Sequence, residues 1–191
     1  QLQGLSTFII EKQPRIGGAS ALSGGGVWVP NNHYLQEAGV KDTYENAKTY
    51  MDATIGDRVP EFLKETYLKR GPEMLRFFHD NTKHMRFKYA TNYSDYYAHL
   101  PGGKPTGRSI EPEIIDMRLL KEWEGLILEP TLSTKGFTMT GQEFHKVNMI
   151  MRTIKGKATS LKLGTRMIKS KLTGARYASL GRALMARMAL S

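Results

Sequence analysis

The sequence predicts an α/β fold that is rich in helix. A short β-rich run at residues 6–10 ends at an acidic residue, Glu11, and five glycines follow between Gly17 and Gly26. In most of the remaining chain, apolar residues recur every three or four positions, as they do in amphipathic helices. A strand that ends in an acid before a glycine-rich stretch is typical of a nucleotide-binding βαβ unit. We therefore predict part of a Rossmann-type domain.

Composition sets the outer limits. The chain has 191 residues, of which 40% are hydrophobic and 24% charged, as in ordinary globular proteins. No apolar run approaches the ~20 residues that a membrane-spanning helix needs. The chain has no cysteine, which excludes disulfides, thiolate metal sites and a thiol nucleophile and suits a cytoplasmic protein. The first ten residues lack the pattern of a signal peptide.

Local signals predict the elements of the first half. Residues 6–10 are expected to form a buried strand. The pair Asp42-Thr43 is an N-cap signal, with Glu45 as the acid of a capping box, and it predicts a helix that runs to about Ile55.

A second helix is expected to begin at Pro60 and to be interrupted by Gly71-Pro72, because proline cannot donate a backbone hydrogen bond. It is expected to restart over residues 73–80. Alternating apolar and basic side chains then predict a half-exposed strand at residues 85–89.

The second half is predicted to be less regular. Residues 100–108 form a loop rich in proline and glycine, and no element is predicted from Leu119 to Thr140. Helices are expected over 142–153, 161–172 and 175–190, with a break at Gly174. The last helix is expected to turn four side chains inward, namely Leu180, Leu184, Met185 and Met188.

The glycine-rich stretch carries the predicted cofactor chemistry. Glu11 stands where the acid of a βαβ unit accepts hydrogen bonds from ribose hydroxyls. Backbone N–H groups of the stretch can surround a pyrophosphate and the edge of a flavin. These candidates are Gly17, Gly18, Ser20, Ser23, Gly24, Gly25 and Gly26. The alternative is that the glycines only form a tight loop.

The phosphate-binding Gly-x-Gly-x-x-Gly turn should precede such an acid by roughly 20 residues. Ten residues precede Glu11, and they contain one glycine, Gly4. We therefore expect this chain to lack the first strand and the dinucleotide turn of the unit.

These residues resemble the flavin-binding segment of the 3-ketosteroid Δ1-dehydrogenases, which belong to the fumarate reductase-like flavoprotein superfamily. The resemblance rests on Glu11-Lys12, on Gly17-Gly18 through Ser23-Gly24-Gly25-Gly26-Val27-Trp28-Val29-Pro30, on Gly56-Asp57-Arg58, on Tyr93-Ser94-Asp95-Tyr96-Tyr97, on Gly107 to Pro112 and on Gly181-Arg182-Ala183-Leu184. It implies a partial Rossmann-type FAD-binding domain, with Lys12 added to the cofactor-binding residues.

The resemblance also implies a reaction. Family members bind FAD and oxidise the C1–C2 bond of a 3-ketosteroid, with a tyrosine taking the C2 proton and flavin N5 taking the C1 hydride. Tyr96 matches a second catalytic tyrosine, which hydrogen-bonds to that base, and Tyr93 matches an aromatic wall of the steroid pocket. The base tyrosine has no counterpart in this chain, so the chain alone is expected to show no turnover.

The resemblance divides the chain into three parts. Residues 1–118 are expected to be an FAD-binding segment with a tyrosine-bearing substrate loop, 119–172 an insert that ends in basic helices, and 173–191 a helix that returns to the FAD-binding domain. Two other functions stay open. One is another flavoprotein of the superfamily, such as a ketosteroid Δ4-dehydrogenase or a fumarate reductase-like enzyme. The other is a non-catalytic basic fragment that binds a membrane surface or an acidic partner.

Charge is concentrated at the end of the chain. The net charge is +10, and residues 151–191 hold ten Lys and Arg but no acid, so they carry the whole excess. Apolar residues alternate with the cations of residues 152–171, which suits peripheral contact with an anionic membrane. No aromatic side chain for base stacking lies among these cations before Tyr177, which disfavours a nucleic-acid partner.

The remaining candidates are weaker. Arg108 could anchor its loop through carbonyl groups or Glu111, or it could lie on the surface. The five histidines have no metal-ligand spacing, so we expect no metal site and mostly surface positions. Ser20 and Ser23 lack the Gly-x-Ser-x-Gly pattern of a nucleophile.

Overall fold

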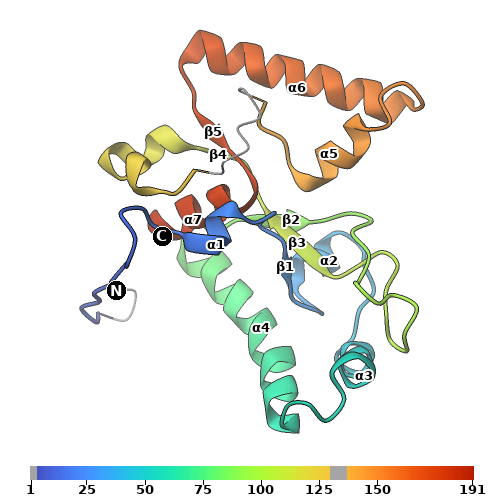
Figure 1. The fold of residues 1–191 in the computed structure, drawn as a ribbon. Coiled ribbons are helices and arrows are strands. Elements are labelled where there is room, and N and C mark those ends of the chain that lie inside the picture. Colours follow the sequence, from blue (N-terminus) through green and yellow to red (C-terminus); the bar gives the residue numbers. More distant parts are fainter. Residues whose placement is uncertain (1–3, 130–136) are drawn as a thin grey trace. The chain divides into compact units, whose positions relative to one another are not determined.

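We analysed a computed structural model of the chain, which describes residues 4–129 and 137–191. The chain divides into two compact units, and Figure 1 labels the helices and strands that they contain. Unit 1 comprises Gln1–Gly25, Asn81–Arg86 and Pro112–Ser191, and unit 2 comprises Gly26–Asp80 and Phe87–Glu111. The glycine-rich stretch therefore falls almost entirely in unit 1, and the tyrosine loop falls in unit 2.

A small sheet organises unit 2. Its strand order is β1 (Val27–Trp28), β3 (Ser109–Pro112), β2 (Phe87–Tyr89). β1 and β3 are antiparallel, with Val27 opposite Ile110 and Trp28 opposite Ser109. All four residues of β3 are buried. The strand predicted at residues 85–89 is thus confirmed in part. β3 was not predicted, because it is only four residues long and ends in Pro112, and proline argues against a strand.

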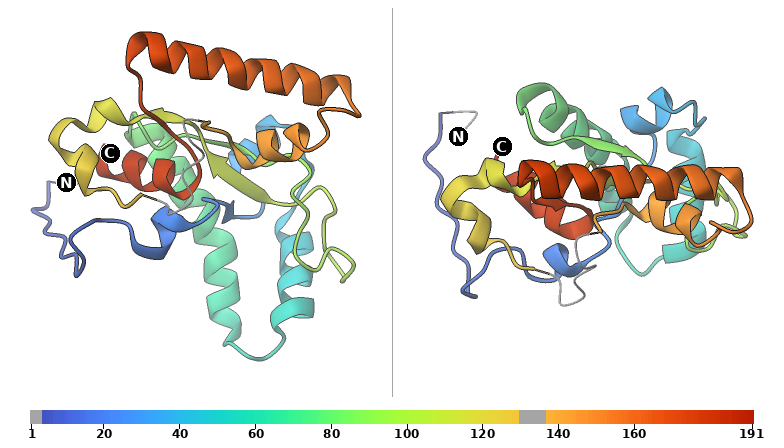
Figure 2. Two further views of the ribbon diagram at one scale, coloured as in Figure 1. Left: turned by 45° about the horizontal axis from the view of Figure 1, so that its top comes forward. Right: turned by 90° about the horizontal axis from the view of Figure 1, so that it is seen from above.

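Three helices complete unit 2: α2 (His33–Glu37), α3 (Tyr44–Ile55) and α4 (Glu61–Asn81). α3 and α4 run side by side and are joined by a short turn (Figure 2, left). Ala47, Met51 and Leu68 form their buried contact. Thr43, not Asp42, caps α3 by accepting from the Asn46 N–H. The capping box is therefore absent from α3, since the acid at Glu45 is one position too early.

α4 corrects the prediction of an interrupted helix. It continues for 21 residues with Pro72 inside. Proline removes one helical hydrogen bond at a cost of about 3 kcal/mol. Packing offsets this cost, because Leu68 and Leu75 are buried on either side of the proline. Gly71 lies close to Val29, whose Cγ1 would be 3.1 Å from an added Cβ.

In unit 1, helix α7 (Leu180–Ala189) packs on the short helix α1 (Gly18–Leu22). β4 (Ile115–Asp116) pairs antiparallel with β5 (Tyr177–Ala178), and the 3₁₀ segment η1 (Met117–Leu126) follows β4. The core of this unit lies between β4, η1, β5 and α7 and consists of Ile115, Met117, Leu120, Ile127, Ala178, Ala183 and Ala186.

Helices α5 (Gly141–Val147) and α6 (Ile154–Thr173) also belong to unit 1 and pack on each other. Thr140 and Glu143 form a complete capping box at the start of α5. Glu143 also accepts hydrogen bonds of 2.7 and 2.8 Å from Arg166 of α6. α6 ends at Thr173, and its C-cap Gly174 is left-handed, so the predicted break at Gly174 is confirmed.

Several predicted boundaries in unit 1 are wrong. The predicted helix at 142–153 ends at Val147, and the one at 161–172 begins at Ile154, where Thr153 caps it. η1 occupies residues for which no element was predicted; Pro130 to Gly136 lie outside the described residues.

Two further corrections concern apolar faces. Residues 6–10 form no strand in the described part of the chain, and Phe8, Ile9 and Ile10 are at least 85% exposed. They form no backbone ladder within the described residues, and a strand is stable only in such a ladder.

α7 begins at Leu180 and buries Gly181, Ala183, Ala186 and Arg187, whereas Met188 is half exposed. Small residues face inward because α7 approaches α1 closely.

Candidate functional site

Three tyrosines lie on one loop of unit 2. The exposed fractions of Tyr93, Tyr96 and Tyr97 are 54%, 91% and 49%. The rings of Tyr96 and Tyr97 meet edge to face with centroids 5.5 Å apart. Aromatic side chains of this size are seldom left so exposed, which makes the loop a candidate contact surface.

A buried carboxylate holds this loop. Asp95 is 3% exposed and accepts from the Trp28 indole N–H at 2.8 Å and from the Lys104 backbone N–H at 3.0 Å. It also accepts a hydrogen bond from Arg108. The side chain between the exposed tyrosines is therefore the one that is fixed most firmly.

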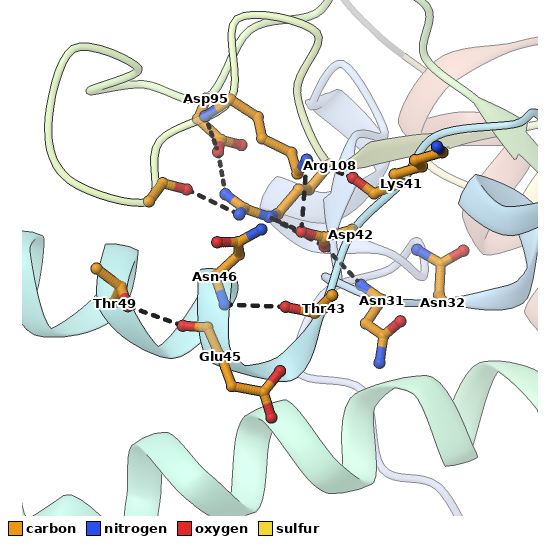
Figure 3. A network of polar contacts seen from close by, with 12 residues as sticks. Asn31, Asn32, Lys41, Asp42, Thr43, Glu45, Asn46, Thr49, Asp95 and Arg108 are labelled. Carbon is orange, nitrogen blue, oxygen red and sulfur yellow. Dashed lines mark hydrogen bonds and ion pairs between the residues drawn. The ribbon is translucent and has the colours of Figure 1, made fainter.

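Arg108 is the centre of this network (Figure 3). Its side chain is fully buried. Nε lies 3.0 and 3.1 Å from the two carboxylate oxygens of Asp42, Nη1 contacts Asp95, and Nη2 donates to the Gly102 carbonyl at 2.8 Å. The prediction that Arg108 anchors the loop through a carbonyl is confirmed. Two acids that sequence reasoning did not name as partners of Arg108, Asp42 and Asp95, bind it in this network.

The charges of the network balance. One guanidinium lies between two buried carboxylates, and the Lys104 ammonium lies 3.9 Å from Asp42. Asp42 also accepts from the Asn31 backbone N–H at 2.8 Å. Removing one partner of such a buried group leaves a charge uncompensated and typically costs 3–5 kcal/mol.

Aromatic rings extend the same support. The Trp28 ring stacks on Tyr67 with centroids 6.1 Å apart and lies 5.8 Å from Tyr50. The Tyr50 hydroxyl accepts from the Tyr97 backbone N–H at 3.0 Å. Tyr96 therefore stands between two attached residues, Asp95 and Tyr97.

In unit 1, the glycine stretch contains two kinds of position. Gly17 and Gly25 have φ of 120° and 68°, and a Cβ on either would overlap neighbouring atoms, at 2.7 Å from Ala21 and 2.5 Å from Leu180. Gly18 and Gly24 have no other heavy atom within 4 Å of an added Cβ, and neither does Gly26 at the start of unit 2. Gly17 and Gly25 are therefore needed for the local backbone conformation and packing. Gly18, Gly24 and Gly26 leave backbone that a ligand can approach.

The two serines of the stretch differ. The Ser23 hydroxyl donates to the Ser20 carbonyl at 2.8 Å and accepts from the Gly25 N–H at 3.0 Å, so it stabilises the turn itself. Ser20 is exposed. Of the pair, Ser20 is therefore the better candidate for direct contact with a ligand.

Glu11 is exposed and accepts from the Gln13 backbone N–H at 3.0 Å. This hydrogen bond lowers the pKa of Glu11 below its usual value. The carboxylate is therefore ionised at neutral pH, as an acceptor for ribose hydroxyls must be. Lys12 beside it is also exposed.

Sequence reasoning missed most of the Arg108 network. Asp42 was assigned to a helix cap, and Asp95 and Trp28 were quoted only as parts of a motif. The available signal was an acid within a run of tyrosines, because a carboxylate that is buried among aromatic side chains must be paired or hydrogen-bonded. His33, predicted with the other histidines as a surface residue, is 4% exposed.

The described part of the chain was examined for metal sites and membrane spans. Within residues 4–129 and 137–191, no three His, Cys, Asp or Glu side chains gather as metal ligands would. No helix in these same ranges is both long and apolar enough to cross a bilayer.

Comparison with known proteins identifies the class of fold. A model of the FAD binding domain family matches residues 1–188. The chain therefore belongs to this family, and its cofactor is FAD. It has an FAD-binding flavoprotein fold in a helix-rich form with small sheets. The exposed backbone at Gly18, Gly24 and Gly26 and the ionised Glu11 fit this cofactor.

Individual relatives are more specific. The chain is 46% identical over 189 residues to a 3-oxosteroid 1-dehydrogenase of Mycolicibacterium smegmatis, which covers 96% of this chain and 32% of the relative. It is 41% identical to the enzyme of the same name from Mycobacterium tuberculosis, with the same coverage.

A solved structure gives the same indication. The crystal structure of 3-ketosteroid Δ1-dehydrogenase from Sterolibacterium denitrificans, in complex with 1,4-androstadiene-3,17-dione, matches with a TM-score of 0.82 and 32% identity. The match covers 98% of this chain and 34% of that protein. The chain thus spans about a third of the length of these relatives.

Proposed function

We propose that this chain is part of an FAD-dependent oxidoreductase that introduces a C1–C2 double bond into 3-ketosteroids. The similarity to 3-oxosteroid 1-dehydrogenases over 96% of the chain carries this proposal. The fixed loop that presents Tyr93 and Tyr96 supports it independently, since it supplies the aromatic and phenolic groups that the reaction needs.

FAD, when bound, supplies the acceptor for the hydride that leaves C1. Glu11, Lys12, Gly17, Gly18, Ser20 and Gly24 to Gly26 are proposed to hold it, with Ser23 shaping the turn. Tyr93 is proposed to contact the steroid. Tyr96 is proposed to donate a hydrogen bond to a tyrosinate that takes the C2 proton.

The chemistry of Tyr96 follows from acidity. A free tyrosine has a pKa near 10 and is a weak base at neutral pH in its phenol form. A hydrogen bond to the phenolate favours the ionised form and lowers the pKa of the base. This role requires the Tyr96 hydroxyl to be held in place.

The finer domain description is also a proposal. Residues 1–118 would form a partial Rossmann-type FAD-binding segment without its first strand and dinucleotide turn. Residues 119–172 would be an insert, and residues 173–191 would return to the FAD-binding domain. The close packing of α7 on α1 supports the last point.

A second candidate is a related dehydrogenase of a smaller cyclic ketone. The chain is 40% identical over 114 residues to a 4-oxocyclohexanecarboxylate 2-dehydrogenase of Sinomonas cyclohexanicum, which covers 60% of the chain. A second Sinomonas enzyme, a 4-oxocyclohex-2-ene-1-carboxylate 5-dehydrogenase, matches 99% of the chain at 32% identity. The higher identity of two steroid dehydrogenases, 46% and 41% over 96% of the chain, favours the steroid. Comparing both ketones as substrates decides between them.

We also propose a peripheral membrane contact through residues 152–171, in a cytoplasmic protein. On α6, Ile154, Leu161 and Ile168 are spaced by seven residues and are 86%, 71% and 55% exposed. They form one apolar stripe. Five lysines on the same helix are exposed, namely Lys155, Lys157, Lys162, Lys169 and Lys171, and this combination suits anionic lipid.

Vesicle co-sedimentation tests the membrane contact. The protein should bind vesicles that contain anionic lipid, and Leu161→Ser should weaken this binding. Leu119→Ser is a matched control, because Leu119 is 52% exposed on η1. Binding that ignores anionic lipid and the Leu161 change would contradict the contact.

Size-exclusion chromatography with visible absorbance and intact mass on one peak tests the main proposal. A yellow peak whose polypeptide is much longer than 191 residues, and which oxidises 3-ketosteroids, is expected. A colourless peak of this chain alone would instead favour a non-catalytic basic fragment.

A further inference from the structure

Asp95 occupies an unusual place in the tyrosine loop. It is 3% exposed, whereas the next residue, Tyr96, is 91% exposed. We propose that Asp95, held by Arg108 and Trp28, is a positioning residue that sets the place of the Tyr96 hydroxyl. This inference rests on the proposed function of Tyr96.

The donors that hold the Asp95 carboxylate come from residues far apart in the sequence. The Asp95 carboxylate accepts from Trp28 of β1, from the Lys104 backbone and from Arg108. The Asp95 backbone N–H in turn donates to the Lys104 carbonyl at 3.0 Å. Groups from β1 and from the loop at 100–108 thus fix the residue that precedes Tyr96.

The residue that follows Tyr96 is also held in place. The Tyr97 N–H donates to the hydroxyl of Tyr50, a buried residue of α3. With Asp95 and Tyr97 both attached, the backbone of Tyr96 has little freedom. The exposed Tyr96 side chain therefore extends from a constrained backbone.

The turn at Gly107, next to Arg108, packs against the start of the tyrosine loop. Gly107 has φ of 76°, and an added Cβ would lie 1.6 Å from the Tyr93 carbonyl oxygen. The backbone beside Arg108 is thus packed directly against the backbone of the first tyrosine. The same network therefore constrains Tyr93 as well.

Only an ionised carboxylate meets the demand of this site. All three groups that face Asp95 are donors, and a carboxylate accepts through both oxygens. An asparagine presents one oxygen and one NH₂ group, so it would place a donor against Arg108 or Trp28. The variant Asp95→Asn is nearly identical in size and removes the positioning while leaving Tyr96 in the chain.

Loss of position has a measurable effect on rate. A displacement of about 1 Å at a reacting group can lower a rate by about 100-fold. We expect Asp95→Asn to lower kcat by roughly 10- to 100-fold, with flavin content unchanged. Asp80→Asn is the control, since Asp80 is exposed in the same unit, and it should leave kcat unchanged.

A double-mutant cycle in the full-length flavin-loaded enzyme separates positioning from general stability. If Asp95 acts through Tyr96, Asp95→Asn should have little further effect on kcat when Tyr96→Phe is already present. Independent losses that multiply, or an Asp95→Asn enzyme with normal kcat, would overturn the inference.

Hydrogen exchange gives a readout that does not need turnover. Asp95→Asn should speed exchange at the Tyr97 and Lys104 amides, with little change in α6. Unchanged exchange at these amides would also overturn the inference. If the wild-type enzyme fails to oxidise steroids, the proposed function fails, and the exchange experiment still decides whether Asp95 fixes the loop.

Discussion

Trp28 donates its indole N–H to the buried carboxylate of Asp95 across 2.8 Å, although 67 positions separate the two residues in the sequence. Trp28 comes two residues after the last glycine of the predicted flavin-binding stretch, and Asp95 lies within the predicted substrate loop. One hydrogen bond therefore connects β1, which follows the glycine-rich stretch, to the loop that carries Tyr93 and Tyr96.

Removing this donor should destabilise unit 2. Trp28→Phe keeps a ring against Tyr67 but leaves one oxygen of Asp95 without its donor. Hydrogen bonds to charged groups contribute about 1.5–3 kcal/mol, so we expect a loss of this size in the free energy of unfolding, measured with urea. Trp123→Phe, at a half-exposed site, should change it by no more than about 0.5 kcal/mol. Equal effects would contradict the account.

Arg108→Met should be more damaging. It leaves two carboxylates, Asp42 and Asp95, buried without their guanidinium, and the expected loss is about 3–5 kcal/mol. Arg70→Met breaks an exposed pair with Glu73, whose contribution should be below about 1 kcal/mol. Thermal unfolding compares the two variants. A loss for Arg108→Met no larger than that for Arg70→Met would show that the network contributes little.

Acid should loosen the contact between α5 and α6. Burial alone would raise the pKa of Glu143, but hydrogen bonds from Arg166 and from the Thr140 N–H outweigh it and lower the pKa from 4.5 to about 2. Because the folded-state pKa is the lower one, this stabilisation is present above the unfolded-state pKa. It is lost as the pH falls through about 4 to 2.

The thermal midpoint of the wild type should therefore decline over this acid range, and Glu143→Gln should flatten that part of the profile. Glu122→Gln, at an exposed position, is the control. An unchanged slope in the Glu143 variant would show that another group causes the decline.

Gly181→Ala should disturb the glycine stretch. An added Cβ would lie 2.0 Å from the Ser20 carbonyl oxygen and 2.9 Å from the Ser23 hydroxyl, so α7 would have to move away from α1. We expect a cost of about 1–3 kcal/mol and weaker flavin retention. Gly164→Ala in α6 meets nothing within 4 Å and should stabilise by up to about 1 kcal/mol. Equal flavin retention in both variants would argue against a cofactor role for this stretch.

Sequence reasoning predicted the features that depend on neighbours in the chain. Helix α3, the second half of α6, the break at Gly174 and the loop at 100–108 follow from local signals. It failed where contacts between residues far apart in the chain determine the local structure. Pro72 stays helical because Leu68 and Leu75 are buried, and residues 6–10 have the composition of a strand but no ladder in the described part of the chain.

The same distinction applies to the site. Tyr93 and Tyr96 could be chosen because they stand in a motif. Asp42 and Asp95 could not be paired with Arg108, because spacing alone does not say which acids meet a buried cation across 66 and 13 positions. The cofactor and substrate roles of the motif residues remain predictions that the experiments above test.

The proposed oxidation of 3-ketosteroids is tested by mixing the purified flavoprotein with a 3-ketosteroid without oxygen and following the visible absorbance of the flavin over time. We expect the steroid to bleach this absorbance and to gain a C1–C2 double bond, and Tyr96→Phe to slow both changes. A yellow protein that keeps its oxidised spectrum in the presence of the steroid would contradict this proposal.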